Sequence, residues 1–239
     1  MFTGFPFGHD HPFTYPEGKR VLELAMGELR SRRDLQDQLG MNPASGRKAI
    51  RGSKANEVWD FLSLSTAKEG KKSTNNPHLT LVVSWQAVEA LVIVPHAVNK
   101  VVRQKLIDLG KDGFREQAED VVDCLKQKKL LRDHGGATPW FRGHQRHSLP
   151  RARGAPLVVD AIIEGDLRTA IPSGGPIKTQ PRWLFAAYGL FVDKENSNYE
   201  MQMGVQFRYE RCPELQQANA IGLIASAWLG CKPLIDLAR

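Results

Sequence analysis

The stretch from Pro77 to Pro95 reads PHLTLVVSWQAVEALVIVP, and it sets the fold class. Leu79, Leu81 and Val83 alternate with His78, Thr80 and Val82, which is the period of a half-buried strand. After Trp85-Gln86, the run from Val88 to Val94 is almost continuously apolar, which is typical of a strand buried on both faces. The stretch therefore predicts a β-hairpin whose second strand is the more deeply buried.

Three more stretches have strand patterns. LVVDAIIEGDLRTAI, residues 157–171, alternates between apolar and charged positions. RWLFAAYGLFV, residues 182–192, is apolar on both faces and predicts a central strand, with Phe185 in its interior. YEMQMGVQFRYE, residues 199–210, places Met201, Met203, Val205, Phe207 and Tyr209 on one face and predicts the partner of residues 182–192 in a second hairpin.

Helical spacing appears between these strands. It predicts helices over residues 17–40, 55–62, 99–110, 112–125 and the region after Pro213. Because hairpins dominate and no regular strand–helix–strand alternation appears, we expect an α+β fold: a mainly antiparallel sheet of about five strands, with helices packed on one face. Residues 1–16 predict an irregular N-terminal arm, and residues 17–239 a single domain.

Composition limits the function classes. The 239 residues carry a net charge of +7, which favours an acidic partner. No apolar run approaches the roughly 20 residues of a membrane span, and no secretion signal is recognisable, so we expect no membrane partner. The three cysteines, Cys124, Cys212 and Cys231, are too widely spaced for a disulfide framework and suit a reducing cytoplasm.

Two segments concentrate the positive charge. The first is residues 137–156, ATPWFRGHQRHSLPRARGAP, with four arginines, two aromatic residues and no acidic residue. The second is residues 44–73, which hold seven Lys or Arg. Both are rich in Gly, Ser and Pro and predict loops, where side chains and N–H groups reach phosphates. Aromatic side chains beside arginine are typical of surfaces that stack and neutralise single-stranded nucleic acid. The candidate nucleic-acid-binding residues are Arg47, Lys48, Arg51, Lys54, Trp140, Phe141, Arg142, Arg146, Arg151 and Arg153.

Two sets of side chains are candidates for catalysis. His144 and His147 lie among arginines, which favour the neutral imidazole that a general base needs, as in metal-independent ribonucleases. Asp160, Glu164 and Asp166 share one strand face and could bind Mg²⁺ in a nuclease, although an alternating charged face is also the ordinary wet side of an edge strand. The phosphate-binding, dinucleotide-binding and nucleophile-elbow motifs are absent, and we expect no cofactor and no metal site.

The sequence thus predicts a cytoplasmic, basic α+β protein that binds nucleic acid, as RNA or DNA, and that suits a subunit of a nucleoprotein assembly. Two alternatives stay open. The first is a nuclease, using either His144 and His147 or the Asp160, Glu164 and Asp166 face. The second is a protein–protein interaction subunit, with the aromatic arm and the apolar last helix as contact surfaces. The positive charge of residues 44–73 and 137–156 has two further interpretations: the segments could be solvated loops without a ligand, or they could bind a small anion.

Overall fold

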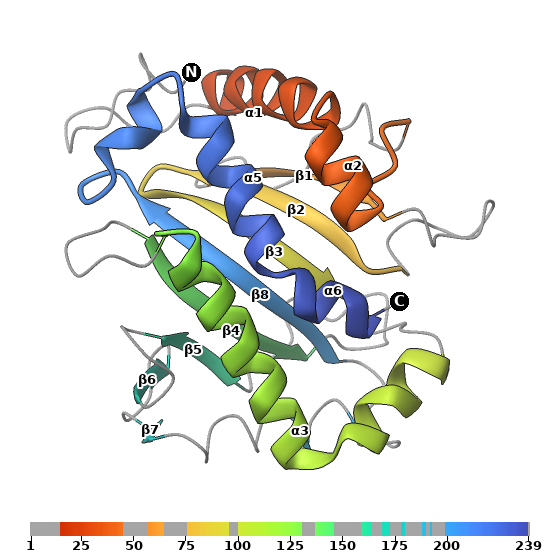
Figure 1. The fold of residues 1–239 in the computed structure, drawn as a ribbon. Coiled ribbons are helices and arrows are strands. Elements are labelled where there is room, and N and C mark those ends of the chain that lie inside the picture. The colour runs from red at the N-terminus through yellow and green to blue at the C-terminus, as the bar shows by residue number, and fades with distance from the viewer. Residues whose placement is uncertain are drawn as a thin grey trace, which may run out of the picture.

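A computed structural model describes residues 15–44, 57–64, 76–95, 100–130, 137–145, 159–163, 169–172, 178–179, 188–189, 192 and 199–238. It shows an α+β arrangement in which an antiparallel sheet lies behind several helices (Figure 1). The strands are β1 (Glu57–Ser63), β2 (His78–Ser84), β3 (Ala87–Val94), β4 (Ala137–Gln145), β5 (Val159–Ile163), β6 (Thr169–Pro172), β7 (Lys178–Thr179) and β8 (Tyr199–Arg208). The helices are α1 (Tyr15–Arg30), α2 (Arg33–Leu39), α3 (Lys100–Gln127), the 3₁₀ turn η2 (Pro213–Gln216), α5 (Ala220–Gly230) and α6 (Lys232–Ala238).

The sheet order is β1-β2-β3-β8-β4-β5-β6-β7, and every pairing is antiparallel. The hairpin expected over residues 77–95 is present as β2 and β3. The described strands number eight, against the five that we expected. The arm assigned to residues 1–16 lies outside the described residues except for its last two, because α1 begins at Tyr15.

The prediction of a central strand over residues 182–192 is contradicted at the three of these residues that the structure describes. Tyr188, Gly189 and Val192 are helical, and β8 has β3 on one side and β4 on the other, so β8 takes the central place. An unbroken apolar run does not distinguish a buried strand from a buried helix, which is why the pattern misled. Phe185 lies outside the described residues.

The helix predicted over residues 55–62 is also wrong, because Glu57–Ser63 forms β1. Its β-branched and aromatic residues favour a strand, and a run this short fits either period. The helix predicted over residues 17–40 is divided into α1 and α2 at Ser31 and Arg32. Gly110, expected to separate two helices, has a φ of 69° and breaks α3 at that point.

The main core lies between the sheet and the helices. Alternate residues of β1, β2, β3 and β8 pack against α1, α2, α3, α5 and α6, and Trp228 of α5 is fully buried there. Met201, Met203, Val205, Phe207 and Tyr209 are all buried on this face, as predicted. The opposite face also buries Val82, Leu91 and Ile93, with Trp59 packed against them. The prediction of helices on one face is therefore not confirmed.

One ion pair joins the helices to the sheet. Arg30, in the last turn of α1, donates to the Asp60 carboxylate of β1 at 3.1 Å, and the Asp60 side chain is only 5% exposed. A carboxylate this deeply buried is stabilised in part by its cationic partner, because a buried charge that loses such a partner is destabilising.

Changing Arg30 to alanine is therefore expected to lower the free energy of unfolding by about 2–4 kcal/mol. Urea denaturation monitored by circular dichroism measures the change. Lys232→Ala is the matched control, because Lys232 pairs with Asp236 on an exposed helix surface and its loss should cost less than about 0.5 kcal/mol. If both substitutions lowered the free energy of unfolding by the same amount, the Arg30–Asp60 pair would not have the stabilising role described here.

Candidate nucleic-acid interface

The structure changes the interpretation of the basic segment that begins at Ala137. We expected a loop, but its first nine residues form β4, paired with β8 and β5. Trp140 lies opposite Gly204 and Ile162, and Phe141 lies opposite Met203 and Ala161. The strand propensity of Thr138, Trp140 and Phe141 outweighs the arginine and glycine content that suggested a loop.

The polar residues of the same segment are divided between β4 and the residues after Gln145. Arg142 lies opposite Gln202 on β8 and Asp160 on β5, and His144 lies opposite Glu200. The predicted site residues after β4 lie outside the described residues: Arg146, His147, Arg151 and Arg153. The same is true of Arg47, Lys48, Arg51 and Lys54. For these eight residues, the structure gives the described residues between which their segments lie in the chain.

The described residues at the ends of these segments can be placed by the register of the sheet. Ser63, His78, Ile93, Gln202, Arg142 and Asp160 lie in one row across β1, β2, β3, β8, β4 and β5. We call this side of the sheet the Ser63 end. At about 4.8 Å between neighbouring strands, the row is about 24 Å long. The opposite side, the Ser84 end, contains Glu57, Ser84, Ala87, Arg208 and Ala137.

Three basic segments are attached at the Ser63 end. Residues 65–75 connect Leu64 to Asn76, and residues 146–158 connect Gln145 to Val159. Residues 45–56 come after Ala44, whose N–H bonds the Asn42 side chain, while the Asn42 N–H bonds the Ser63 carbonyl at 2.9 Å. The register thus anchors residues 65–75 and 146–158 at the Ser63 end on both sides, whereas residues 45–56 begin near that end and finish at Glu57 on the Ser84 end.

The distribution of charge supports this grouping. The described residues hold 18 of the 33 Lys and Arg and 19 of the 26 Asp and Glu. The remaining residues therefore hold 15 basic and 7 acidic side chains, and they supply the whole positive excess of the chain. The excess is concentrated in residues 45–56, 65–75 and 146–158, which together hold ten Lys or Arg and one Glu.

The acidic strand face is only partly placed. Asp160 lies in β5, but β5 ends at Ile163, so Glu164 and Asp166 fall outside the described residues. Within the part of the chain that the structure describes, no three His, Cys, Asp or Glu side chains gather as metal ligands. His78, near the same end of the sheet, has a structural role: it is buried, its Nδ1 is 2.7 Å from the Asn76 carbonyl oxygen, and its ring packs at a tilt of 49° against the ring of Phe61.

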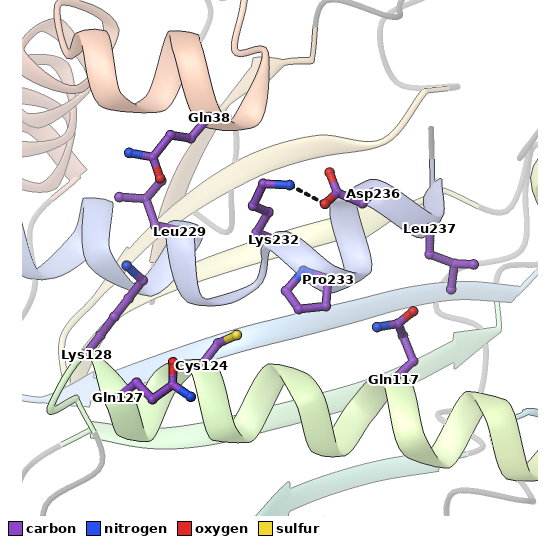
Figure 2. Close-up of a pocket in the computed structure, with 10 residues that line it drawn as sticks. All are labelled: Gln38, Gln117, Cys124, Gln127, Lys128, Leu229, Lys232, Pro233, Asp236 and Leu237. Carbon is purple, nitrogen blue, oxygen red and sulfur yellow. Dashed lines mark hydrogen bonds and ion pairs between the residues drawn. The ribbon is translucent and has the colours of Figure 1, made fainter.

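A cleft of about 630 Å³ lies on the outer side of the helices, between α3 and the α5–α6 corner, with α2 at its rim (Figure 2). Figure 2 shows Lys232 and Asp236 paired across one side of it. Its polar lining consists of three carboxamides, two ammonium groups, one carboxylate and one thiol: Gln38, Gln117, Gln127, Lys128, Lys232, Asp236 and Cys124. Sequence reasoning missed this cleft, because its residues come from separate helices and share no spacing.

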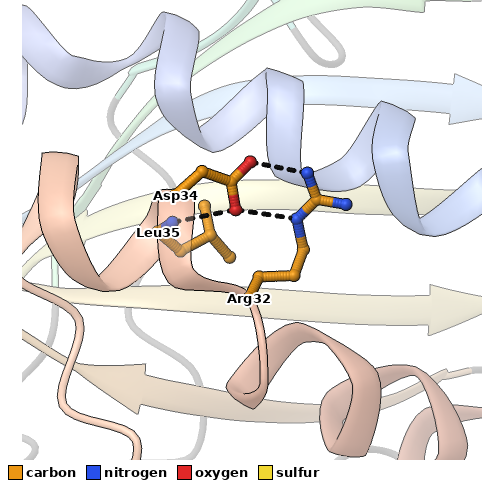
Figure 3. Close-up of polar contacts among 3 residues, drawn as sticks. All are labelled: Arg32, Asp34 and Leu35. Carbon is orange, nitrogen blue, oxygen red and sulfur yellow. Dashed lines mark hydrogen bonds and ion pairs between the residues drawn. The ribbon is translucent and has the colours of Figure 1, made fainter.

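Helix α2, which contributes Gln38, is held at its start by a local network (Figure 3). Asp34 accepts hydrogen bonds from Arg32 Nε at 2.9 Å, from Arg32 Nη2 at 2.5 Å and from the Leu35 N–H at 3.0 Å. The hydrogen bond from Arg32 holds the pKa of Asp34 below its usual value. This network therefore stabilises the fold at neutral pH, and its contribution is lost as the pH falls through the lowered pKa.

The cysteines do not form a reactive site. Burial, with Glu214 nearby, raises the pKa of Cys212 to about 11, so the adjacent Arg211 does not make it a reactive thiolate. Burial raises the pKa of Cys231 to about 12. All three cysteines are free.

Comparison of the sequence with protein-family models and with curated proteins found no match. Among the described helices, none is by itself long and apolar enough to cross a bilayer; α5 and α6 reach that length only together, across a bend of 51°.

Proposed function

We propose that this protein binds nucleic acid through its cationic connecting segments, with the Ser63 end of the sheet as the contact surface. The observation that supports the proposal most is the charge of two segments: residues 45–56 and 146–158 together contain seven Lys or Arg and no Asp or Glu. A structural use of these cations would need acidic partners nearby, and residues 146–158 contain none.

The physical basis is phosphate neutralisation. Each Lys or Arg that contacts a phosphate releases condensed counterions, and this sequence-independent term supplies most of the affinity in non-specific binding. Segments 45–56 and 146–158 together hold seven such cations: Arg47, Lys48, Arg51, Lys54, Arg146, Arg151 and Arg153. A row about 24 Å long suits several consecutive nucleotides of a single strand, the range that single-strand-binding domains contact.

Trp140 and Arg142, which share one face of the strand by its period of two, are proposed to add stacking to this electrostatic contact, whereas Phe141 lies in register with the core residue Met203. They lie in β4, which is paired on both sides and is therefore a fixed element. Aromatic residues on strands of a sheet are a common platform for unpaired bases. The cytoplasm remains the compartment that we expect, because the cysteines are free and widely spaced.

The direct test is fluorescence anisotropy with labelled 20-nucleotide single-stranded RNA and DNA, at about 50 mM salt and in EDTA. We expect binding to both, with the RNA left intact. Absence of binding at this salt concentration would contradict the proposal. If a stable protein complex formed in the same preparation without nucleic acid, the interaction-subunit interpretation would replace it.

The same samples test the nuclease alternative. RNA cleavage in EDTA that falls about 10²- to 10⁴-fold in His144→Ala or His147→Ala would show a histidine general base. Cleavage that requires Mg²⁺ and is lost in Asp160→Ala would assign the chemistry to the acidic strand. We expect neither result, because His144 lies in a paired strand and is not in the shared loop that the histidine mechanism assumed.

A further inference from the structure

Trp85 is an exposed tryptophan at the turn between β2 and β3. Its exposed fraction is 49%, and the one other large apolar residue exposed to this degree among the described residues is Leu24 on α1. A single exposed apolar side chain is common on protein surfaces, so the surroundings of Trp85 decide whether it suits a ligand.

Hydrogen bonds within the turn, and from the turn to Tyr209, fix the backbone around Trp85. Ser84 Oγ accepts the N–H groups of Gln86 at 3.3 Å and Ala87 at 3.1 Å, and it lies 3.1 Å from the Ala87 carbonyl. The phenol of Tyr209 lies 3.0 Å from the Ser84 carbonyl oxygen, and the Tyr209 N–H bonds the Gln86 carbonyl at 3.2 Å. Tyr209 is itself buried, so the backbone of the turn that carries Trp85 is tied to the core.

Two arginines stand beside this turn. Arg208 pairs with Ala87 in the sheet register, and its Nε donates to the Gln206 side chain at 3.1 Å. The Arg211 N–H bonds the Arg208 carbonyl, and both arginine side chains are exposed. Two exposed carboxylates, Glu57 and Glu210, are also near, so the local charge is balanced and stacking, not net charge, is what this site offers.

A protein interface does not fit Trp85 well. Such interfaces surround their aromatic anchor with further apolar surface, and no other exposed large apolar residue is described on this turn. An exposed aromatic ring on a turn whose neighbouring strand end carries exposed arginines is instead suited to an unpaired base and its phosphates. The turn is also next to a cationic stretch in the sequence, because Glu57, opposite Ser84, comes directly after residues 45–56.

We infer that Trp85 is a stacking platform for one base of a single-stranded nucleic acid, with Arg208 and Arg211 contacting the adjoining phosphates. This inference rests on the proposed function and adds a second contact point. The strand of nucleic acid would extend from the Ser63 end to the Ser84 end, about 23 Å apart along a seven-residue strand.

The test compares variants in the anisotropy assay with single-stranded 20-mers. Trp85→Ala is expected to lower the affinity about 5- to 150-fold, the range for loss of one stacked base, while Trp85→Phe retains most of it. The salt dependence should stay the same in Trp85→Ala, because no phosphate contact is removed. In Arg208→Ala and in Arg211→Ala, the slope of log K against log salt concentration should become shallower by about 0.7, because each substitution removes one phosphate contact. Leu24→Ala, which removes the other exposed apolar side chain, should leave the affinity unchanged.

The outcomes separate this inference from the function on which it rests. If Trp85→Ala binds like the wild type while the wild type binds well, the inference is overturned and the proposed function stands. If Trp85→Ala instead loses contact with a protein partner, the turn is a protein-binding surface and the inference is again overturned. A wild type that binds no nucleic acid overturns both. Thermal denaturation of each variant shows that the fold is intact, since an exposed Trp85 contributes little to stability.

Discussion

Replacing Gly204 with alanine is expected to lower the free energy of unfolding by more than about 3 kcal/mol. Gly204 lies in β8, the strand between β3 and β4, and a Cβ there would lie 2.0 Å from the Ala90 carbonyl oxygen and 2.8 Å from the Leu91 Cα. Both are backbone atoms of a paired strand, so they cannot move aside as the end of a flexible side chain would. Forced overpacking of this kind usually costs about 1–3 kcal/mol, and a rigid backbone neighbour places this case at or above that range.

Thermal denaturation measures this effect. For a chain of this size, 3 kcal/mol corresponds to a fall in Tm of about 6–12 °C. Gly27→Ala is the matched control: Gly27 is exposed on α1 with nothing within 4 Å of its added Cβ, and alanine there should stabilise the helix by about 0.5–1 kcal/mol. A Gly204→Ala variant as stable as the wild type would show that β8 is not held against β3 as described.

Reversing the charge of Arg146, Arg151 and Arg153 to glutamate is expected to weaken single-stranded RNA binding on the order of 100-fold or more. Three favourable phosphate contacts would become three repulsions, and like-charge contacts of this kind cost several kcal/mol. Arg142 is left unchanged, because it lies in the paired strand β4 and its replacement would confuse binding with sheet stability. Anisotropy at about 50 mM salt measures the affinity.

A matched control reverses three cations of the folded body, at Lys105, Lys111 and Lys126 on α3. This variant has the same change in net charge, so it separates a local contact from the overall charge of the protein. We expect it to lose far less affinity than the arginine variant. Equal losses would mean that net charge alone drives binding, and a large fall in Tm of the arginine variant would mean that these arginines are structural.

Some parts of the fold can be predicted from the sequence because their patterns have a single interpretation. The alternation in Leu79–Val83 and in Met201–Phe207 has period two over a sufficient length, and both segments are strands with the expected face buried. The other face of β2 is buried as well, so β2 is not the half-buried strand that we expected and is buried to the same degree as β3. Residues 182–192 and 55–62 are apolar without a decisive period, so strand and helix fit equally well, and the tertiary structure decides. Segment 137–145 shows how strand propensity can be hidden by arginine and glycine.

The candidate site is less accessible to sequence reasoning. Charge counting selects the basic segments, but their attachment along the Ser63 end depends on strand register, which joins Ser63 to Asp160 across six strands. The exposure of Trp85 depends likewise on the fixed turn beneath it, because a tryptophan between two strands is equally compatible with burial. The cleft between α3 and α6 is assembled from several helices, and no local pattern marks it.

The salt dependence of single-stranded nucleic-acid binding tests the central proposal most directly. If the seven cations of segments 45–56 and 146–158 contact phosphates, log K against log salt should have a slope of about −5, at about −0.7 per contact on a single strand. Changing Arg146, Arg151 and Arg153 to alanine should make that slope shallower by about 2. A wild-type slope shallower than about −1, or one that the three alanines leave unchanged, would contradict the assignment of these segments to phosphate binding.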